Sequence, residues 1–272
     1  VFPFLKKIFR TWPFPTDGLE PFRSFMTKYL NQRQQDIKND QNNVKRNDLG
    51  SVFVDMMNRV ETPEFQKVGF LPETAIAQVL EVFFASYDST GTSLNICMYY
   101  LSKHPQYQDK VIEEVDAIFN KYDNELTPGS LGEFTFLVAC LNEAMRLNPA
   151  FIRPERNCTK DWIVDREYGR QIKIPKGANV LIPIWALHRH PDYFLEPETF
   201  NPDRFMPENI KKIHPYSFAA FGHGPKNCIG MKLAYNNMIL ILANIFREFT
   251  VEARPDTQLK MKAGRLFVSQ FE

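Results

Sequence analysis

One cysteine lies in a loop whose composition suits metal chemistry. Glycines stand at positions 222, 224 and 230 around Cys228, and an apolar helical pattern begins directly afterwards. Glycine permits backbone conformations that other side chains forbid and lets the backbone approach a flat ligand closely. The free N–H groups and positive dipole end of a helix start stabilise a thiolate, which a haem iron needs on its proximal side. For a lone cysteine, a buried thiol at a glycine turn is the alternative interpretation.

Three other segments place charged or hydroxyl groups at informative spacings. Glu143 and Arg146 are one helical turn apart and share a helix face. Arg204 lies in the segment 200–205, and the polar segment 85–90 interrupts an otherwise apolar helical pattern. Taken singly, each is weak evidence. The Glu143–Arg146 pair could be an exposed ion pair worth a few tenths of a kcal/mol, and the polar segment an ordinary cluster of hydroxyl groups.

Together these segments resemble the cytochrome P-450 family. Residues 221–230 (FGHGPKNCIG) resemble its cysteine loop, FxxGxxxCxG, and residues 143–146 (EAMR) resemble its ExxR helix. Residues 200–205 (FNPDRF) resemble its FxPERF segment, and residues 85–90 (ASYDST) its oxygen-binding AGx(D/E)TT segment. The four occur in the family's order with similar spacing, which disfavours accident. IPKG, ALHRHP and GPKNCIGMKLA are most like microsomal animal members near the 3 clan.

The resemblance implies a mainly α fold with minor β sheets. It covers the C-terminal part of the cytochrome P-450 fold, from about the F–G helices through the long I helix, the ExxR helix, the cysteine loop and the L helix. We expect residues 1–272 to form a partial cytochrome P-450 domain. The N-terminal part of that domain, with its membrane anchor and first sheet, is then missing from this chain.

By resemblance the haem-binding set consists of Cys228, Phe221, Gly222, Lys226, Gly230, Arg156 and Arg153. Cys228 is the expected axial ligand of the iron of haem b, and Phe221 is expected to shield its sulfur. Lys226 is expected to pair with a haem propionate where the family usually has Arg; Lys keeps the charge but loses the planar fork. Arg156 is the second expected propionate partner, with Arg153 as the alternative.

The family's ExxR helix implies a structural network of Glu143, Arg146 and Arg204. Two guanidiniums around one carboxylate can pin the irregular loop beneath the haem. Histidines are the other iron ligands that the sequence offers. We expect structural hydrogen bonds for His188 and an exposed position for His223.

The polar segment of the long helix is expected over the distal face of the haem, with Asp88, Ser89 and Thr90 as catalytic residues. Asp88 and the next hydroxyl would relay protons during dioxygen activation. A hydroxyl bonded to a helix carbonyl can also open the helix locally. Ser86 replaces the family's usual Gly and Ser89 its usual Thr, so proton delivery is expected to be looser, with Thr90 as a substitute.

An apolar pocket for a lipophilic substrate is expected near the haem. Its candidate residues are Phe84, Ala85, Ser89, Ala150, Phe151 and Ile152. The first three would face the haem from the long helix, and the others follow Pro149, where the family's substrate-contacting strand begins.

Several elements must position these residues. Periodicity predicts helices over residues 17–37, 49–60, 72–104, 107–121, 134–147 and 230–249. Short strands are expected within residues 162–184 and β structure within 250–272, with a long irregular loop over 191–225. The helix that begins at Pro72 is apolar nearly all round, so we expect it to be buried along much of its length.

Composition narrows the function classes. The chain of 272 residues has 33 Lys and Arg against 32 Asp and Glu, which gives no general reason to expect nucleic-acid binding. Cys97 and Cys140 lie in apolar helical stretches, where inert buried thiols are expected. No apolar run reaches the roughly 20 residues of a membrane span, although the aromatic and basic segment 1–14 could lie on a membrane surface or pack as a helix end.

The resemblance implies an NADPH-dependent monooxygenase that oxidises a lipophilic small molecule. No nucleotide-binding fingerprint is present, so electrons must come from another protein. The resemblance implies NADPH–cytochrome P-450 reductase as that donor, with cytochrome b5 as a further partner. Basic residues near Lys226 and Lys232 could form the docking patch. The expected location is the cytoplasmic face of the endoplasmic reticulum membrane. A haem-thiolate isomerase or dehydratase, which needs no reductase, and an inactive truncated fragment are the alternatives.

Overall fold

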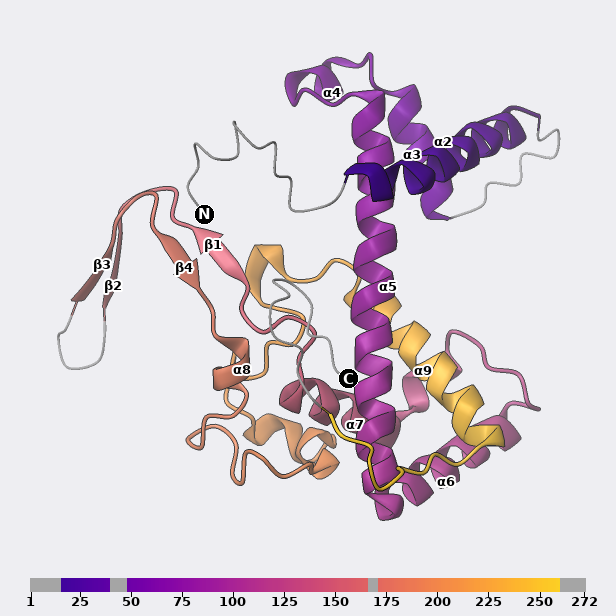
Figure 1. The fold of residues 1–272 in the computed structure, drawn as a ribbon, viewed down its shortest axis with the longest axis vertical. Coiled ribbons are helices and arrows are strands. Elements are labelled where there is room, and N and C mark those ends of the chain that lie inside the picture. The colour runs from indigo at the N-terminus through magenta and orange to yellow at the C-terminus, as the bar shows by residue number, and fades with distance from the viewer. Residues whose placement is uncertain (1–15, 40–47, 166–170, 260–272) are drawn as a thin grey trace. The chain divides into compact units, whose positions relative to one another are not determined.

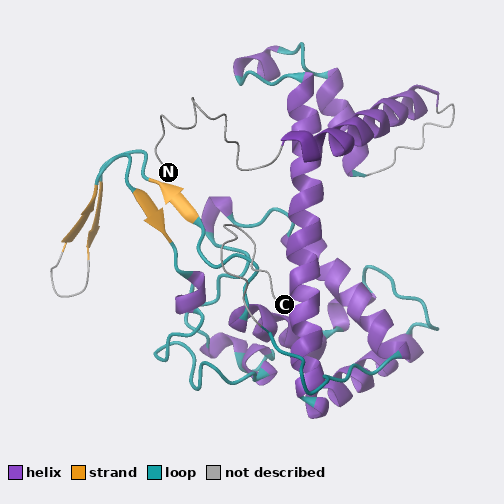
Figure 2. Cartoon of the chain, in the orientation of Figure 1, coloured by secondary structure: helices purple, strands orange, loops and turns teal. Residues whose placement is uncertain are grey.

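A computed structural model describes residues 16–39, 48–165 and 171–259 of the chain. Helices make up most of this structure, and strands contribute only short pieces (Figure 2). The chain forms two compact units, Val1–Ala85 and Ser86–Glu272, which are described separately. The mainly α fold with minor β sheets that the sequence predicts is confirmed.

The first unit is built from helices around a small apolar core. Its elements are α2 (Thr16–Asn39), α3 (Leu49–Asn58), α4 (Pro63–Lys67) and the first part of α5 (Pro72–Lys103). Asp48 begins α3, because its side chain accepts a hydrogen bond from the N–H of Ser51 at 2.8 Å. The core residues are Met26, Leu30, Phe53, Val54 and Val79.

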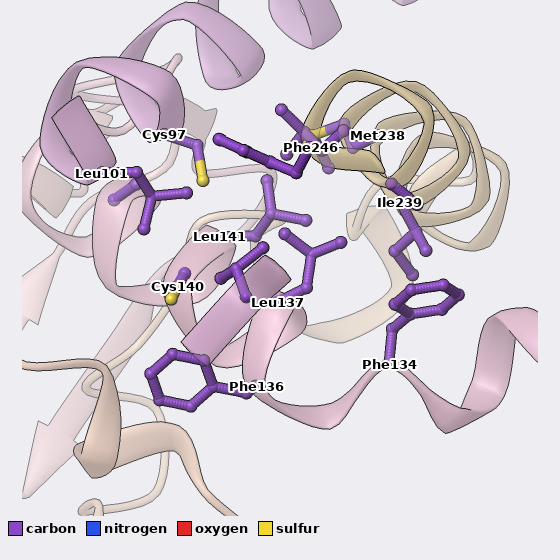
Figure 3. Packing of buried hydrophobic residues seen from close by; sticks show 14 of the residues in the cluster. Cys97, Leu101, Phe134, Phe136, Leu137, Cys140, Leu141, Met238, Ile239 and Phe246 are labelled. Carbon is purple, nitrogen blue, oxygen red and sulfur yellow. The ribbon is translucent and has the colours of Figure 1, made fainter. Parts of the chain in front are cut away.

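The second unit holds the larger core. It is formed by the rest of α5 with α6 (Pro105–Lys121), α7 (Thr135–Leu147) and α9 (Met231–Glu248), which gather around one apolar cluster (Figures 1 and 3). α7 is buried on nearly all sides, and Leu137 and Leu141 are fully inaccessible to solvent. Because α7 carries Glu143 and Arg146, these two charged residues are positioned from the centre of the unit.

Two antiparallel ribbons form the β structure. β1 (Glu155–Asn157) pairs with β4 (Asn179–Leu181), and β2 (Trp162–Asp165) pairs with β3 (Gln171–Ile174). The register places Arg156 opposite Val180. The remaining short elements are η1 (Ser130–Glu133), α8 (Ile184–Leu187), η3 (Pro202–Phe205), η4 (Ile210–Lys212) and η5 (Gly224–Lys226).

A buried glutamine ties the chain after α9 to α6. The Val251 N–H donates to Gln108 Oε1 at 2.7 Å, and Gln108 Nε2 donates to the Val251 carbonyl at 2.9 Å. Gln108 Nε2 also donates to the Leu101 carbonyl at 3.3 Å. One amide side chain therefore satisfies three backbone groups from separate parts of the sequence.

Several local predictions need correction. The middle of α5 is not buried, since Tyr87 is 73% exposed and Asp88 is also exposed. Leaving these polar groups in water costs less free energy than burying them in a core. Residues 250–259 are irregular rather than β structure, and 260–272 lie outside the described residues. The segment 1–14 also lies outside them. α4 and β1 were not predicted from the sequence.

Candidate functional site

Cys228 is the exposed cysteine of the chain. Cys97 and Cys140 are buried, Cys158 is half-buried, and Cys228 is exposed. Burial raises the pKa of Cys97 to about 12 and that of Cys140 well above its usual range, so these two thiols are inert, as predicted. The alternative interpretation of Cys228 as a buried thiol at a glycine turn is therefore wrong.

The loop around Cys228 is held by its own backbone. The Cys228 N–H donates to the Phe221 carbonyl at 2.8 Å, and the Gly222 N–H donates to the Ala219 carbonyl at 2.9 Å. Gly222 and Gly224 have φ of +70° and +77°, a region that favours glycine. Gly230 was expected to need the same freedom, but its φ is −87°, which any residue adopts. Two of the three glycines are thus conformational requirements.

The thiol lies just before a helix. Gly230 precedes α9, and its carbonyl accepts the first helical hydrogen bond, from the Ala234 N–H at 2.8 Å. The first N–H groups of α9 have no partners within the helix, and the helix dipole is positive at this end. Cys228 is two residues before Gly230, so its backbone leads directly into this end of the helix.

Two cationic side chains adjoin the loop. Arg156 on β1 donates from Nη2 to the Lys226 carbonyl at 3.4 Å, so the β1–β4 ribbon and the cysteine loop meet here. Lys226 is exposed, so its ammonium and the Arg156 guanidinium are two cations at this loop that could hold carboxylate groups. Arg153, the alternative to Arg156, is exposed on the chain before β1.

The Phe221 side chain faces α9. Its ring lies 5.0 Å from that of Tyr235, centroid to centroid. The Tyr235 hydroxyl donates to Asn142 Oδ1 on α7 at 2.5 Å, and burial raises the Tyr235 pKa. Phe221 thus anchors the loop on α9 through its ring and meets Cys228 through its carbonyl. Its shielding of the sulfur remains a prediction.

The donor set of this loop fits a haem. Cys228 offers an accessible sulfur to iron, and Arg156 and Lys226 offer positive charge to the two propionates. Ile229 is fully exposed and Leu233 is 48% exposed, which adds apolar surface for a porphyrin ring. The residues present therefore match the iron, the carboxylates and the flat apolar ring of that group.

Glu143, Arg146 and Arg204 meet in one network. Arg146 donates from Nε to Glu143 Oε2 at 2.6 Å and from Nη2 to Oε1 at 2.8 Å. Arg204 Nε adds a bond to Oε1 at 3.3 Å, and the Asn201 N–H another at 2.9 Å. The side chains of Glu143 and Arg146 are fully buried, so each charge depends on the other.

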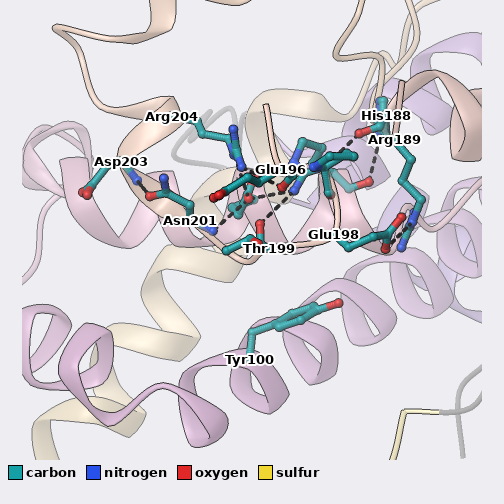
Figure 4. A network of polar contacts seen from close by, with 12 residues as sticks. Tyr100, His188, Arg189, Glu196, Glu198, Thr199, Asn201, Asp203 and Arg204 are labelled. Carbon is teal, nitrogen blue, oxygen red and sulfur yellow. Dashed lines mark hydrogen bonds and ion pairs between the residues drawn. The ribbon is translucent and has the colours of Figure 1, made fainter. Parts of the chain in front are cut away.

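Arg146 also holds the irregular chain after α8. Its guanidinium donates to the carbonyls of His188 at 2.8 Å, Pro197 at 2.7 Å and Thr199 at 3.2 Å. Figure 4 shows His188, Thr199 and Arg204 converging on this network. The contacts to Asn201, Pro197 and Thr199 were not foreseen, because backbone groups of a loop leave no trace in the sequence.

Both histidines near the loop make hydrogen bonds within the fold. His188 is buried, and its Nδ1 lies 3.0 Å from the Arg146 carbonyl, while its Nε2 accepts the Ala219 N–H at 2.8 Å. Burial lowers its pKa to about 4, so the ring is neutral. His223 is exposed and donates from Nε2 to the Phe218 carbonyl at 2.8 Å. The positions predicted for both are confirmed.

The polar segment of α5 is continuous helix. Asp88 is exposed, and Ser89 and Thr90 are half-buried. The expected local opening is not seen, since α5 runs unbroken from Pro72 to Lys103. Ser93, four residues after Ser89, donates from Oγ to the Ser89 carbonyl at 2.9 Å without ending the helix. This bond was not predicted, although a spacing of four on a helix indicates it.

The substrate-pocket candidates fall into two sets. Phe84 belongs to the first unit, where its ring lies 5.3 Å from Phe22 and 5.5 Å from Phe83. Ala85 is exposed in the same unit. In the second unit, Phe151 is 40% exposed, Ala150 and Ile152 are half-buried, and the Ile152 carbonyl accepts the Trp185 N–H at 3.2 Å. A shared pocket remains a prediction.

The helical fold, the buried Glu143–Arg146 pair and the exposed cysteine loop are features expected of a haem-thiolate protein. A family model described as "Cytochrome P450" matches residues 2–270. The chain belongs to the cytochrome P450 family.

Curated relatives agree with this assignment. "Cytochrome P450 3A31" of Mesocricetus auratus is 36% identical over 280 residues, covering 100% of this chain and 52% of the relative. "Cytochrome P450 3A25" of Mus musculus is 36% identical, covering 97% and 51%. "Cytochrome P450 3A5" of Homo sapiens is 35% identical, covering 96% and 50%. The chain spans about half the length of the curated relatives it matches. The predicted likeness to animal members near the 3 clan is confirmed.

Proposed function

We propose that the protein acts as a haem-thiolate monooxygenase on a lipophilic small molecule. The observation that carries the proposal is the exposed thiol of Cys228, in a glycine-bounded loop at the start of α9 and beside Arg156 and Lys226. Cys228 would bind the iron of haem b, and the two cations would hold its propionates. The bound haem would supply dioxygen activation and oxygen-atom transfer.

The chain's own residues would support this chemistry from two sides. Glu143, Arg146 and Arg204 would keep the loop beneath the haem in place, because Arg146 ties α7 to three loop carbonyls. On the other side, Asp88 with Ser89 or Thr90 would deliver protons, since a carboxylate next to hydroxyl groups can pass a proton from solvent. The exposure of Asp88 supports such an entry point.

Electrons would come from NADPH–cytochrome P-450 reductase, with cytochrome b5 as a further donor. Lys226 is exposed, and so is Lys232 at the start of α9, which supports a basic docking patch for an acidic partner. We propose the cytoplasmic face of the endoplasmic reticulum membrane as the location of the protein. Among the described residues, no helix is long and apolar enough to span a membrane.

The decisive experiment is a spectrum of the complete gene product. Reduced with dithionite and exposed to carbon monoxide, the wild type should show the Soret band of a thiolate-ligated haem. Cys228→Ser should lose that band, whereas Cys158→Ser, which changes a half-buried thiol elsewhere, should keep it. A wild-type spectrum typical of histidine ligation would refute the proposal.

Turnover with NADPH and reductase then separates the two catalytic alternatives. A monooxygenase consumes NADPH and dioxygen with a lipophilic substrate. An isomerase or dehydratase rearranges a peroxide without the reductase. The presence of Asp88 and Ser89 favours the first, because a rearranging enzyme needs no proton relay.

A further inference from the structure

We infer that His188 is a positioning residue that holds the start of the cysteine loop against the helix of Glu143 and Arg146. The inference rests on the proposed role of Cys228 as haem ligand. His188 directly follows α8 and is completely buried. His188 contacts α7 at Arg146 and the segment before Cys228 at Ala219.

The contact with α7 runs in both directions between His188 and Arg146. The Arg146 guanidinium donates to the His188 carbonyl at 2.8 Å, and His188 Nδ1 lies 3.0 Å from the Arg146 carbonyl. Rotating the imidazole would break the Nδ1 bond, and moving His188 away from α7 would break both bonds.

The contact with the cysteine loop fixes the proton on the ring. The Ala219 N–H donates to His188 Nε2 at 2.8 Å, so Nε2 is an acceptor. The proton of the neutral ring is therefore on Nδ1, and it is donated to the Arg146 carbonyl. The Phe218 ring also stacks on the imidazole at 5.2 Å with an interplanar angle of 24°. Two consecutive loop residues thus depend on His188.

Backbone hydrogen bonds lead from this point to the sulfur ligand. The Ala219 carbonyl accepts the Gly222 N–H at 2.9 Å, and the Phe221 carbonyl accepts the Cys228 N–H at 2.8 Å. Moving Ala219 would therefore shift the turn at Gly222, and with it the carbonyl that holds Cys228. In this way His188 would set the position of a thiolate that it does not touch.

Two substitutions test the hydrogen bonds of Nδ1 and Nε2 separately. In His188→Asn the short amide keeps a donor near the Nδ1 position but cannot reach Ala219. In His188→Gln the longer side chain keeps an acceptor near the Nε2 position and should rescue the loop. Gln108→Met serves as the matched control, because it removes the hydrogen bonds of a buried polar side chain in the same unit, to Leu101 and Val251.

The test measures amide hydrogen exchange and the reduced carbon monoxide spectrum on the complete gene product. We expect His188→Asn to speed exchange at the Ala219 amide by about tenfold, the effect of one lost hydrogen bond. Amide exchange at Cys228 should also become faster, and the thiolate-type fraction of the Soret band should fall. His188→Gln should restore most of that fraction, and Gln108→Met should keep it while lowering the unfolding midpoint.

The outcomes distinguish this inference from the proposed function. A wild-type protein without the thiolate-type band overturns both. A wild type with the band, together with a His188→Asn variant unchanged in exchange and spectrum, overturns the role of His188 alone. An equal loss of the band in Gln108→Met would mean general destabilisation, and would overturn the role of His188 as well.

Discussion

Glu143 accepts two parallel hydrogen bonds from Arg146, at 2.6 and 2.8 Å, and neither side chain is reached by solvent. Arg204 lies against the same carboxylate at 3.3 Å, so two positive charges share one negative partner. Such an arrangement is stabilising only while all its members remain, because removing one leaves the others buried without compensation.

The first prediction therefore concerns Glu143. Glu143→Gln should lower the free energy of unfolding by about 3–5 kcal/mol, since it leaves two guanidiniums without a carboxylate. Glu198→Gln is the control: its side chain is 72% exposed in the pair with Arg189, so the loss should be at most about 1 kcal/mol. Urea unfolding of both variants measures the difference. Equal losses would contradict the buried network.

The second prediction concerns the start of α7. Glu114 on α6 accepts the N–H groups of Thr135 at 2.8 Å, Phe136 at 2.7 Å and Leu137 at 2.8 Å. A carboxylate there satisfies free N–H groups and faces the positive end of the helix dipole. Glu114→Gln should lower the free energy of unfolding by about 1–3 kcal/mol, as measured by thermal unfolding. The exposed neighbour Glu113, changed to Gln, should have little effect.

The third prediction concerns pH. Burial lowers the His188 pKa from 6.5 to about 4, while the unfolded chain keeps the ordinary value. Above pH 6.5 neither the folded nor the unfolded protein binds this proton, so the titration of His188 does not lower the free energy of unfolding. As the pH falls from 6.5 to about 4, only the unfolded state takes up the proton, so stability is lost, by up to about 3 kcal/mol.

Unfolding of the wild type and His188→Gln across this range isolates the contribution of His188. The difference in free energy between the two proteins should shrink as the pH falls, because glutamine does not titrate. A difference that stays constant from pH 7 to pH 4 would show that His188 does not have a lowered pKa.

The fourth prediction separates the glycines of the cysteine loop. Gly222→Ala should cost about 1–2 kcal/mol and reduce haem incorporation, because φ is +70° there. Gly230→Ala should be nearly neutral, since φ is −87° and an added Cβ would lie 3.9 Å from Cys228 Sγ, an ordinary contact. Haem content per protein measures both, and the opposite ranking would exclude this loop geometry.

The features that the sequence predicted well are local or motif-based. The Glu143–Arg146–Arg204 network and the exposed cysteine loop were predicted because four segments together resemble one family; the spacing of three in Glu143–Arg146 alone left an exposed ion pair equally open. Helix limits were close because Pro72 and Gly230 lie at predicted helix starts and Pro105 follows the predicted end of the long helix; Pro105 itself begins α6, two residues before the predicted start.

The features that could not be predicted from the sequence depend on distant backbone groups or on short polar segments. The carbonyls of Pro197 and Thr199 that bind Arg146 have no residue preference. β1 has three residues, Glu155–Asn157, without an apolar alternation to reveal it. The burial predicted for α5 failed because its apolar content outweighed the polar residues around Asp88 in the pattern.

The hydrogen bonds between Gln108 and Val251 have a consequence for biosynthesis. The two residues are 143 positions apart, so α6 leaves the ribosome long before its partner segment has been translated. α6 packs against both α7 and α9, so the part of its apolar surface that α9 covers stays exposed during that interval. Nascent chains stalled before α9 should therefore be the forms that engage chaperones most strongly.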